Sequence, residues 1–138
     1  MKTILTLVLI FSATMVLQAQ NTIEVSISGF TNDKGKAMIG LYNSENDFLE
    51  NEYKYATPAI LNKQSKVSFT GIPDGVYAIS VFHDEDDDNE FDMFMGFIPR
   101  EDYGNSNNVP PRFGPPEWSD AKFEVRGGEI KTIEIKIL

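Results

Sequence analysis

The sequence predicts an all-β protein: an antiparallel β-sandwich of six to seven strands with one short helix and a long ordered loop. Three observations lead to this class. Apolar and polar residues alternate in several short runs, turn-forming residues separate these runs, and only one segment has the start signal of a helix. Short alternating runs closed by turns are typical of two packed sheets.

The predicted strands cover residues 22–30, 37–42, 66–72, 76–83, 121–126 and 130–138. In the first run, Ile23, Val25 and Ile27 alternate with polar residues, which indicates a strand with one buried face. Ile133 and Ile135 repeat this pattern in the last run, as does Ile137. The run at 76–83 is apolar almost throughout, so we expect it in the centre of a sheet.

Turn and cap signals connect these runs. The turn at 32–35 predicts a hairpin between the first two strands, and the glycines at 127–128 predict another between the last two. Ser44 precedes Asp47 with capping-box spacing, which predicts a short helix through Leu49. Tyr77 follows a Pro-Asp-Gly turn and is expected to be a core tyrosine at a sheet corner.

The N-terminus has the composition of a secretory leader. Lys2 precedes an apolar run from Ile4 to Leu17, and the small residue Ala19 marks the expected cleavage site. This run is shorter than the ~20 residues that span a bilayer. We therefore expect residues 1–19 to be a signal peptide and residues 20–138 to form a single exported domain, periplasmic or extracellular. No second apolar stretch follows, so no membrane insertion is expected after leader cleavage.

Composition excludes several classes of function. The chain has no cysteine, which excludes disulfides, thiolate metal sites and a catalytic thiol. Its formal net charge of −9 argues against nucleic acid and anionic membrane surfaces as partners. A calcium ion, a neutral glycan or a protein partner at the cell envelope fits this charge better.

The segment 84–92 directly follows the fourth predicted strand and holds seven carboxylates in nine residues. Repulsion between adjacent charges costs roughly 0.5–1 kcal/mol per pair even in water. The spacing matches a calcium-binding loop, in which Glu90 would contribute its backbone carbonyl. The candidate metal ligands are Asp84, Asp86, Asp88, Glu90 and Asp92. Calcium prefers such all-oxygen ligand sets, so Ca²⁺ is the expected cofactor.

The remaining loop positions refine this hypothesis. Asn89 stands where the calcium-loop pattern has glycine and tolerates the positive φ required there. Phe91 is apolar and could anchor the loop to the core. Met95 replaces the usual final glutamate, so the metal would need an outside donor such as Glu101, Asp102 or water. The alternative is an acidic surface loop that binds no metal.

A long stretch without periodicity, residues 84–120, normally indicates function or disorder, and its aromatic residues and glycines argue against disorder. Tyr103, Phe113 and Trp118 are possible ligand-binding residues, because aromatic rings stack on sugars and peptides. A carbohydrate- or peptide-binding protein that uses the proline-rich loop 110–118 is therefore the alternative function. A stiff loop that covers one end of the sandwich would have the same composition.

Several segments together resemble a known family. They are GIPDGVYA at 71–78, HDEDDDNEFD at 83–92, GFIPREDYGNSNN at 96–108, FGPP at 113–116 and DAKF at 120–123. This set, in this order, resembles the uncharacterised exported bacterial family called domain of unknown function 2141. The family typically shows His-Asp-x-Asn-x-Asn-Gly-x-x-Asp, in which Asp86, Asp88 and Asn89 are substitutions here. The resemblance implies a prealbumin-like or immunoglobulin-like sandwich and no established activity.

A hydrolase is the weakest hypothesis. His83 is the only histidine, and a lone histidine at the end of a strand is more often a packing or hydrogen-bonding residue. No Gly-x-Ser-x-Gly turn is present, so Ser106 is a poor nucleophile candidate. Transthyretin-like hydrolases share the general sandwich class but use several histidines that this chain lacks. We expect no catalytic residues, and a non-enzymatic binding or structural module with a calcium-stabilised loop.

Overall fold

The computed structural model describes residues 19–138. The predicted signal peptide therefore lies outside the described residues, apart from Ala19. In residues 19–138 no helix has the length and apolar character needed to cross a membrane.

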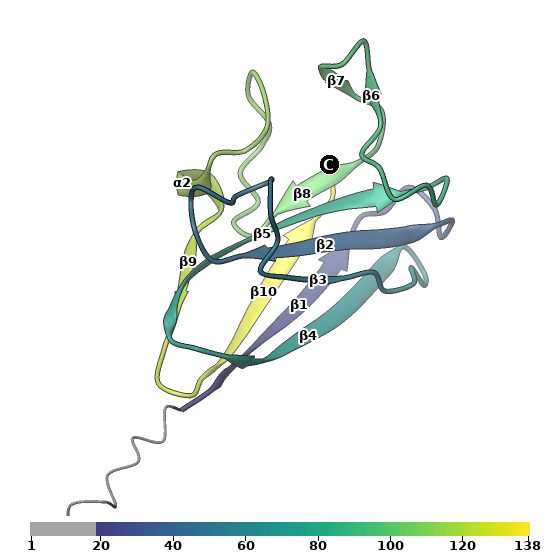
Figure 1. The fold of residues 1–138 in the computed structure, drawn as a ribbon. Helices are drawn as coiled ribbons and strands as arrows, with labels where there is room; N and C mark the ends of the chain where they lie inside the picture. The colour runs from purple at the N-terminus through teal and green to yellow at the C-terminus, as the bar shows by residue number, and fades with distance from the viewer. Residues whose placement is uncertain (1–18) are drawn as a thin grey trace, which may run out of the picture.

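Two β-sheets pack face to face, which confirms the predicted all-β sandwich (Figure 1). The first sheet contains, in spatial order, β10 (Ile130–Lys136), β1 (Asn21–Ser28) and β4 (Gln64–Ile72). The second contains β3 (Lys54–Ala56), β2 (Lys36–Tyr42), β5 (Gly75–Asp84) and β8 (Tyr103–Asn105), with β9 (Phe123–Val125) paired to the start of β5. Outside these sheets lie the hairpin of β6 (Met93–Phe94) and β7 (Ile98–Pro99) and the short helix α2 (Trp118–Ala121).

One apolar core fills the space between the sheets. Ile23, Val25 and Ile27 of β1 are at most 1% exposed, as their alternation predicts. They belong to the same cluster as the inward-facing residues of β2, β5 and β10. Full burial of one such side chain stabilises the fold by about 1.5–3 kcal/mol.

The strand β5 is central, as predicted, because β2 lies on one side of it and β8 and β9 lie on the other. Its outer face is also covered: Ala78 belongs to a second small cluster with Tyr42, Phe48 and Ala121, and Trp118 packs against it. Burial on both faces explains why this run of the sequence is apolar almost throughout.

Both predicted hairpins are wrong. β1 and β2 lie in different sheets, and so do β9 and β10, so each turn carries the chain from one sheet to the other. β10 instead pairs with β1 in parallel, from Thr22 opposite Ile130 to Ser28 opposite Lys136. Alternation shows which face of a strand is buried, but either sheet of a sandwich can bury that face.

The helix predicted after Ser44 is also wrong. The Ser44 hydroxyl does accept a hydrogen bond from the Asp47 backbone N–H at 3.3 Å, but residues 45–50 form only turns. Leu49 adopts a φ of +65°, which ends any right-handed helical run. The short helix lies instead at α2, in the long loop.

Tyr77 occupies the predicted sheet corner. Its side chain is 4% exposed, and its hydroxyl donates a 2.8 Å hydrogen bond to the Pro73 carbonyl. This bond joins the turn after β4 to the start of β5, where the chain passes between the sheets.

We expect Tyr77→Phe to lower the free energy of unfolding by about 1 kcal/mol, because it removes one partly buried hydrogen bond and little apolar area. Chemical denaturation measures the change. Tyr55→Phe is the matched control, since Tyr55 is 74% exposed. Equal effects of the two substitutions would contradict the corner role.

Candidate functional site

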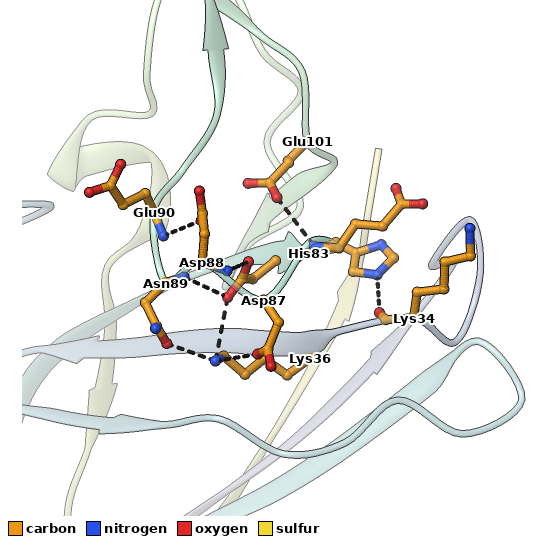
Figure 2. A network of polar contacts seen from close by, with 10 residues as sticks. Lys34, Lys36, His83, Asp87, Asp88, Asn89, Glu90 and Glu101 are labelled. Atoms are coloured by element: carbon orange, nitrogen blue, oxygen red, sulfur yellow. Dashed lines mark hydrogen bonds and ion pairs between the residues drawn. The ribbon is translucent and has the colours of Figure 1, made fainter.

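The acidic loop begins at a rigidly held point, the end of β5. Gly35 has a φ of +62°, and a Cβ there would collide with the carbonyl oxygen of Asp84, so the turn at 32–35 requires glycine. His83 is buried, and its Nε2 lies 2.7 Å from the Lys34 carbonyl oxygen (Figure 2). Because a carbonyl only accepts, Nε2 donates this bond. His83 is thus a packing and hydrogen-bonding residue, as predicted.

Asp84 folds the loop back on itself. Its fully buried carboxylate accepts a 3.1 Å hydrogen bond from the backbone N–H of Asp88 and a 3.0 Å bond from that of Asn89. Asn89 has a φ of +68°, which confirms the predicted left-handed position. The next N–H, of Glu90, donates to the Asp88 carboxylate at 2.8 Å. The bend therefore draws alternate carboxylates together.

Lys36 supplies a cation that the sequence analysis missed. Its ammonium nitrogen lies 2.5 Å from an Asp87 oxygen, 2.7 Å from the Asn89 amide oxygen and 3.5 Å from Asp84 (Figure 2). The register of β2 on β5 places Lys36 opposite Asp84. The hydrogen bond to Asp87 is the main reason that the pKa of Lys36 is raised. Part of the loop's negative charge is thus compensated from within the fold.

Five carboxylates, one of which is that of Asp84, form two overlapping groups. One contains Asp84, Asp86 and Asp88, and the other contains Asp86, Asp92 and Glu101; within each group one oxygen per residue lies within 4.8 Å of the others. The structure therefore brings together the side chains of four of the five predicted ligands. Glu101, one of the two residues proposed as outside donors, joins them.

The two remaining candidate ligands, Glu90 and Asp102, do not join these groups with their side chains. The carboxylate of Glu90 belongs to neither group, and only its backbone carbonyl was expected to serve as a ligand. Asp102 is outside both groups as well, and its carboxylate accepts a hydrogen bond from the Thr31 hydroxyl. Glu101 is held toward the loop by the backbone N–H groups of Glu85 and Asp92, at 3.2 and 3.1 Å.

Crowding of like charges marks this site electrostatically. The pKa of Asp86, whose side chain is exposed, is raised by partial desolvation and then by the charges of Asp88, Asp92 and Asp84. The pKa of Glu101 is also raised, first by burial and further by Asp92 and Asp84. Among residues 19–138, no lysine or arginine forms an ion pair with Asp86, Asp88, Asp92 or Glu101. This side of the loop is an anionic pole without an internal counter-ion.

The sequence model of an uncharacterised protein family conserved in bacteria, domain of unknown function 2141, matches residues 25–134. The chain belongs to this family. No curated protein and no solved structure matches it. In this family member Asp86 and Asp88 stand where the typical family pattern described above has asparagine. The anionic pole is therefore more highly charged than that pattern requires.

Phe91 anchors the loop of this family member, but it packs on half-buried aromatic residues of the second sheet and not on the core as predicted. Its ring centroid lies 5.2 Å from that of Phe82 on β5 and 5.8 Å from that of Tyr103 on β8. The apolar residue in the middle of the acidic run thus fixes the loop against the second sheet.

The aromatic residues of the proline-rich loop do not form one platform. Trp118 packs inward, with its ring centroid 5.8 Å from that of Phe48. Tyr103 and Phe113 line a hollow of about 470 Å³ together with residues 109–117, and Trp118 is not part of its wall. Only two of the three candidate ligand-binding residues therefore share a surface.

Polar side chains after β8 serve the backbone. The Ser106 hydroxyl donates to the Ala121 carbonyl and accepts from the Ile79 N–H at 3.1 Å. Asn105 bonds to both backbone groups of Val109. Asn108 bonds to the Glu134 carbonyl and the Lys136 N–H, at 2.8 Å each, and so occupies part of the edge of β10.

We expect Asp86→Asn to raise the melting temperature in chelator at pH 7, because it removes a charge that the neighbouring carboxylates repel. A carboxyl whose pKa is raised on folding destabilises the folded state above that pKa, and this effect disappears as the pH falls and the group protonates. The gain should therefore shrink toward about pH 4.

Thermal melts of both proteins across this pH range make the measurement. Glu24→Gln removes one charge from an exposed position on β1 and corrects for the change in net charge. If Glu24→Gln stabilises the protein as much as Asp86→Asn does, local repulsion in the loop is not the cause.

Proposed function

We propose that this protein is an exported, non-enzymatic binding or structural module whose acidic loop is stabilised by a calcium ion. The observation that carries the proposal is the convergence of Asp84, Asp86, Asp88, Asp92 and Glu101 in two groups that share Asp86. Calcium takes six to eight oxygen ligands, and its carboxylate ligands are mono- or bidentate. The two overlapping groups offer five carboxylates, and the Glu90 carbonyl would complete a set of that size.

The donor chemistry supports calcium over other metals. All candidate donors are oxygens, and the chain has no cysteine. His83, its one histidine, is buried and bonded to the Lys34 carbonyl. Magnesium requires near-ideal octahedral geometry and retains its water, whereas calcium accepts an irregular loop.

The hydrogen bonds already made by Asp84 and Glu101 are compatible with metal binding. Each carboxylate oxygen has about two lone-pair sites, and the backbone N–H groups of Asp88 and Asn89 each occupy one on Asp84. These bonds hold the ligand oxygens in place before a cation arrives. Preorganisation of this kind reduces the ordering cost of binding.

The bound ion would connect three segments: the end of β5, the acidic loop, and the residues that flank the β6–β7 hairpin. Binding only to the folded state stabilises it by RT ln(1 + [L]/Kd), about 2.7 kcal/mol at a hundredfold excess over Kd. Extracellular calcium modules bind at about 10⁻⁴–10⁻³ M. Such a site would be filled outside the cell, where an exported protein acts.

A non-catalytic role is supported by the state of the polar residues that a hydrolase would use. His83 and Ser106 are both buried, and both are bonded to backbone groups. The carbohydrate- or peptide-binding alternative is weakened because Trp118 packs away from Tyr103 and Phe113.

We expect calcium at millimolar concentration to raise the melting temperature above its value in chelator, and magnesium to raise it much less. The gain should be lost in Asp84→Asn and in Asp92→Asn, because each substitution removes a charged ligand. Glu90→Gln removes a charge from the same loop but leaves the backbone carbonyl, so it should keep the gain. Equal melting temperatures of the unmodified protein in chelator and in calcium would contradict the proposal.

The neighbouring residues Glu101 and Asp102 give a sharper test of the ligand set. Glu101→Gln should lose most of the calcium-induced stabilisation, whereas Asp102→Asn should keep it, because only Glu101 faces the other carboxylates. Calorimetric titration with calcium measures the affinity of each variant. Similar affinities for the two variants would exclude Glu101 as the outside donor.

A further inference from the structure

The tip of the β6–β7 hairpin is apolar and uncovered. Its side chains remain largely accessible in the folded chain: Met93 43%, Phe94 52%, Met95 72%, Phe97 70% and Ile98 46%. The turn between the strands contains Met95 and Gly96, at φ of +54° and +78°. Figure 1 shows this hairpin projecting from the end of the sandwich, away from both sheets.

Both faces of the hairpin are apolar. Neighbouring residues of a strand point to opposite faces, and Met93 and Phe94 are adjacent and both exposed. The core of the fold uses none of the five side chains. Exposed apolar clusters on soluble proteins mark contacts with another protein or with a membrane.

We propose that this hairpin tip is a membrane-docking element, which inserts its apolar side chains into the interface of a zwitterionic lipid bilayer. The inference goes beyond the proposed calcium site and does not depend on it. Its reach is shallow: a loop tip enters the headgroup and acyl boundary, while the sandwich remains in water.

The all-round exposure favours lipid over a protein groove. A groove covers one face of a hairpin, whereas acyl chains surround a tip on every side. In the view of Figure 1 the loop between β8 and α2, which carries the exposed residue Phe113, projects toward the same side as the hairpin, although it leaves the opposite end of β8. Two projecting loops with apolar residues suit contact with an extended surface better than insertion into a single pocket.

Charge argues against two other occupants of the tip, a second copy of the chain and an anionic bilayer. A second copy would bring two chains of formal charge −9 together, with their acidic loops at the bases of the hairpins. Five side chains also form a small patch compared with the roughly 20–30 residues that each partner contributes to a stable protein interface. The same charge repels anionic lipid, which leaves zwitterionic headgroups.

Arg100 supports the orientation of the tip. It directly follows β7, and its guanidinium carbon lies 6.0 Å from the centroid of the Phe94 ring. A long basic side chain beside an inserted aromatic ring can hold its charge at the level of the lipid phosphates. The expectation that the mature chain makes no membrane insertion came from the lack of a second long apolar run, and the tip requires no such run.

Co-sedimentation with phosphatidylcholine vesicles tests the inference, with protein purified after export and its N-terminus determined by mass spectrometry. The unmodified protein should sediment with the vesicles. The double variant Met95→Ser with Phe97→Ser should partition about tenfold more weakly or worse, because two apolar side chains are lost. The double variant Tyr55→Ser with Leu61→Ser changes residues that are 74% and 72% exposed elsewhere and should partition normally.

Thermal melts of each variant confirm that it is folded, and assays in chelator and in calcium separate the two proposals. Vesicle binding both in chelator and in calcium supports membrane docking by the hairpin tip, independently of the calcium site. If the unmodified protein sediments with vesicles neither in chelator nor in calcium, the inference is overturned. An equal loss of binding in the two double variants overturns it as well. A dimer in solution that only the tip variant abolishes would identify a second copy as the occupant and would also overturn it.

Discussion

The buried carboxylate of Asp84 is the interaction on which the acidic loop depends. It ends β5, the central strand, and receives two backbone N–H groups of the loop and the ammonium of Lys36. A buried charge is tolerated only when it is paired and hydrogen-bonded. Since Asp84 meets both requirements, the chain can reverse direction directly after the core despite the repulsion among seven carboxylates. Its neighbour His83 secures the same point through Lys34, so the loop leaves a rigid edge of the sheet.

The negative charge of the acidic loop is compensated on one side only. Lys36 compensates Asp84 and Asp87, whereas the carboxyls of Asp86 and Glu101 have raised pKa values because they are partly desolvated among other acids. The backbone N–H of Asp92 draws Glu101 toward the loop, and Phe91 packs the middle of the loop against Phe82 and Tyr103. The fold thus holds like charges together at a cost in stability, which a divalent cation bound between them would reduce.

Much of this could be predicted from sequence because it is local. The alternation of Ile23, Val25 and Ile27 identifies a buried face, and the loop spacing identifies Asp84, Asp86, Asp88 and Asp92 as neighbours. Strand partners are not local. The turn at 127–128 suits a hairpin or a crossing between sheets equally well, and only packing of the whole chain places β10 in parallel beside β1. The contribution of Lys36 and the choice of Glu101 over Asp102 depend on such long-range placement. The register of β2 on β5 delivers Lys36, and the return of the chain through β7 delivers Glu101.

The acidic loop and the apolar hairpin are connected at the base of the hairpin. Asp92 precedes β6 and Glu101 follows β7, and the Arg100 N–H donates to the Asp92 carbonyl at 2.9 Å, so both carboxylates stand at the base of the hairpin. Their repulsion tends to open this base, and a cation between them would close it. The two proposals meet at this base: an ion bound there would restrict how the tip is presented, although the tip is apolar with or without it. Calcium would then change the strength of docking by lowering the ordering cost of the hairpin, without contacting the docked side chains.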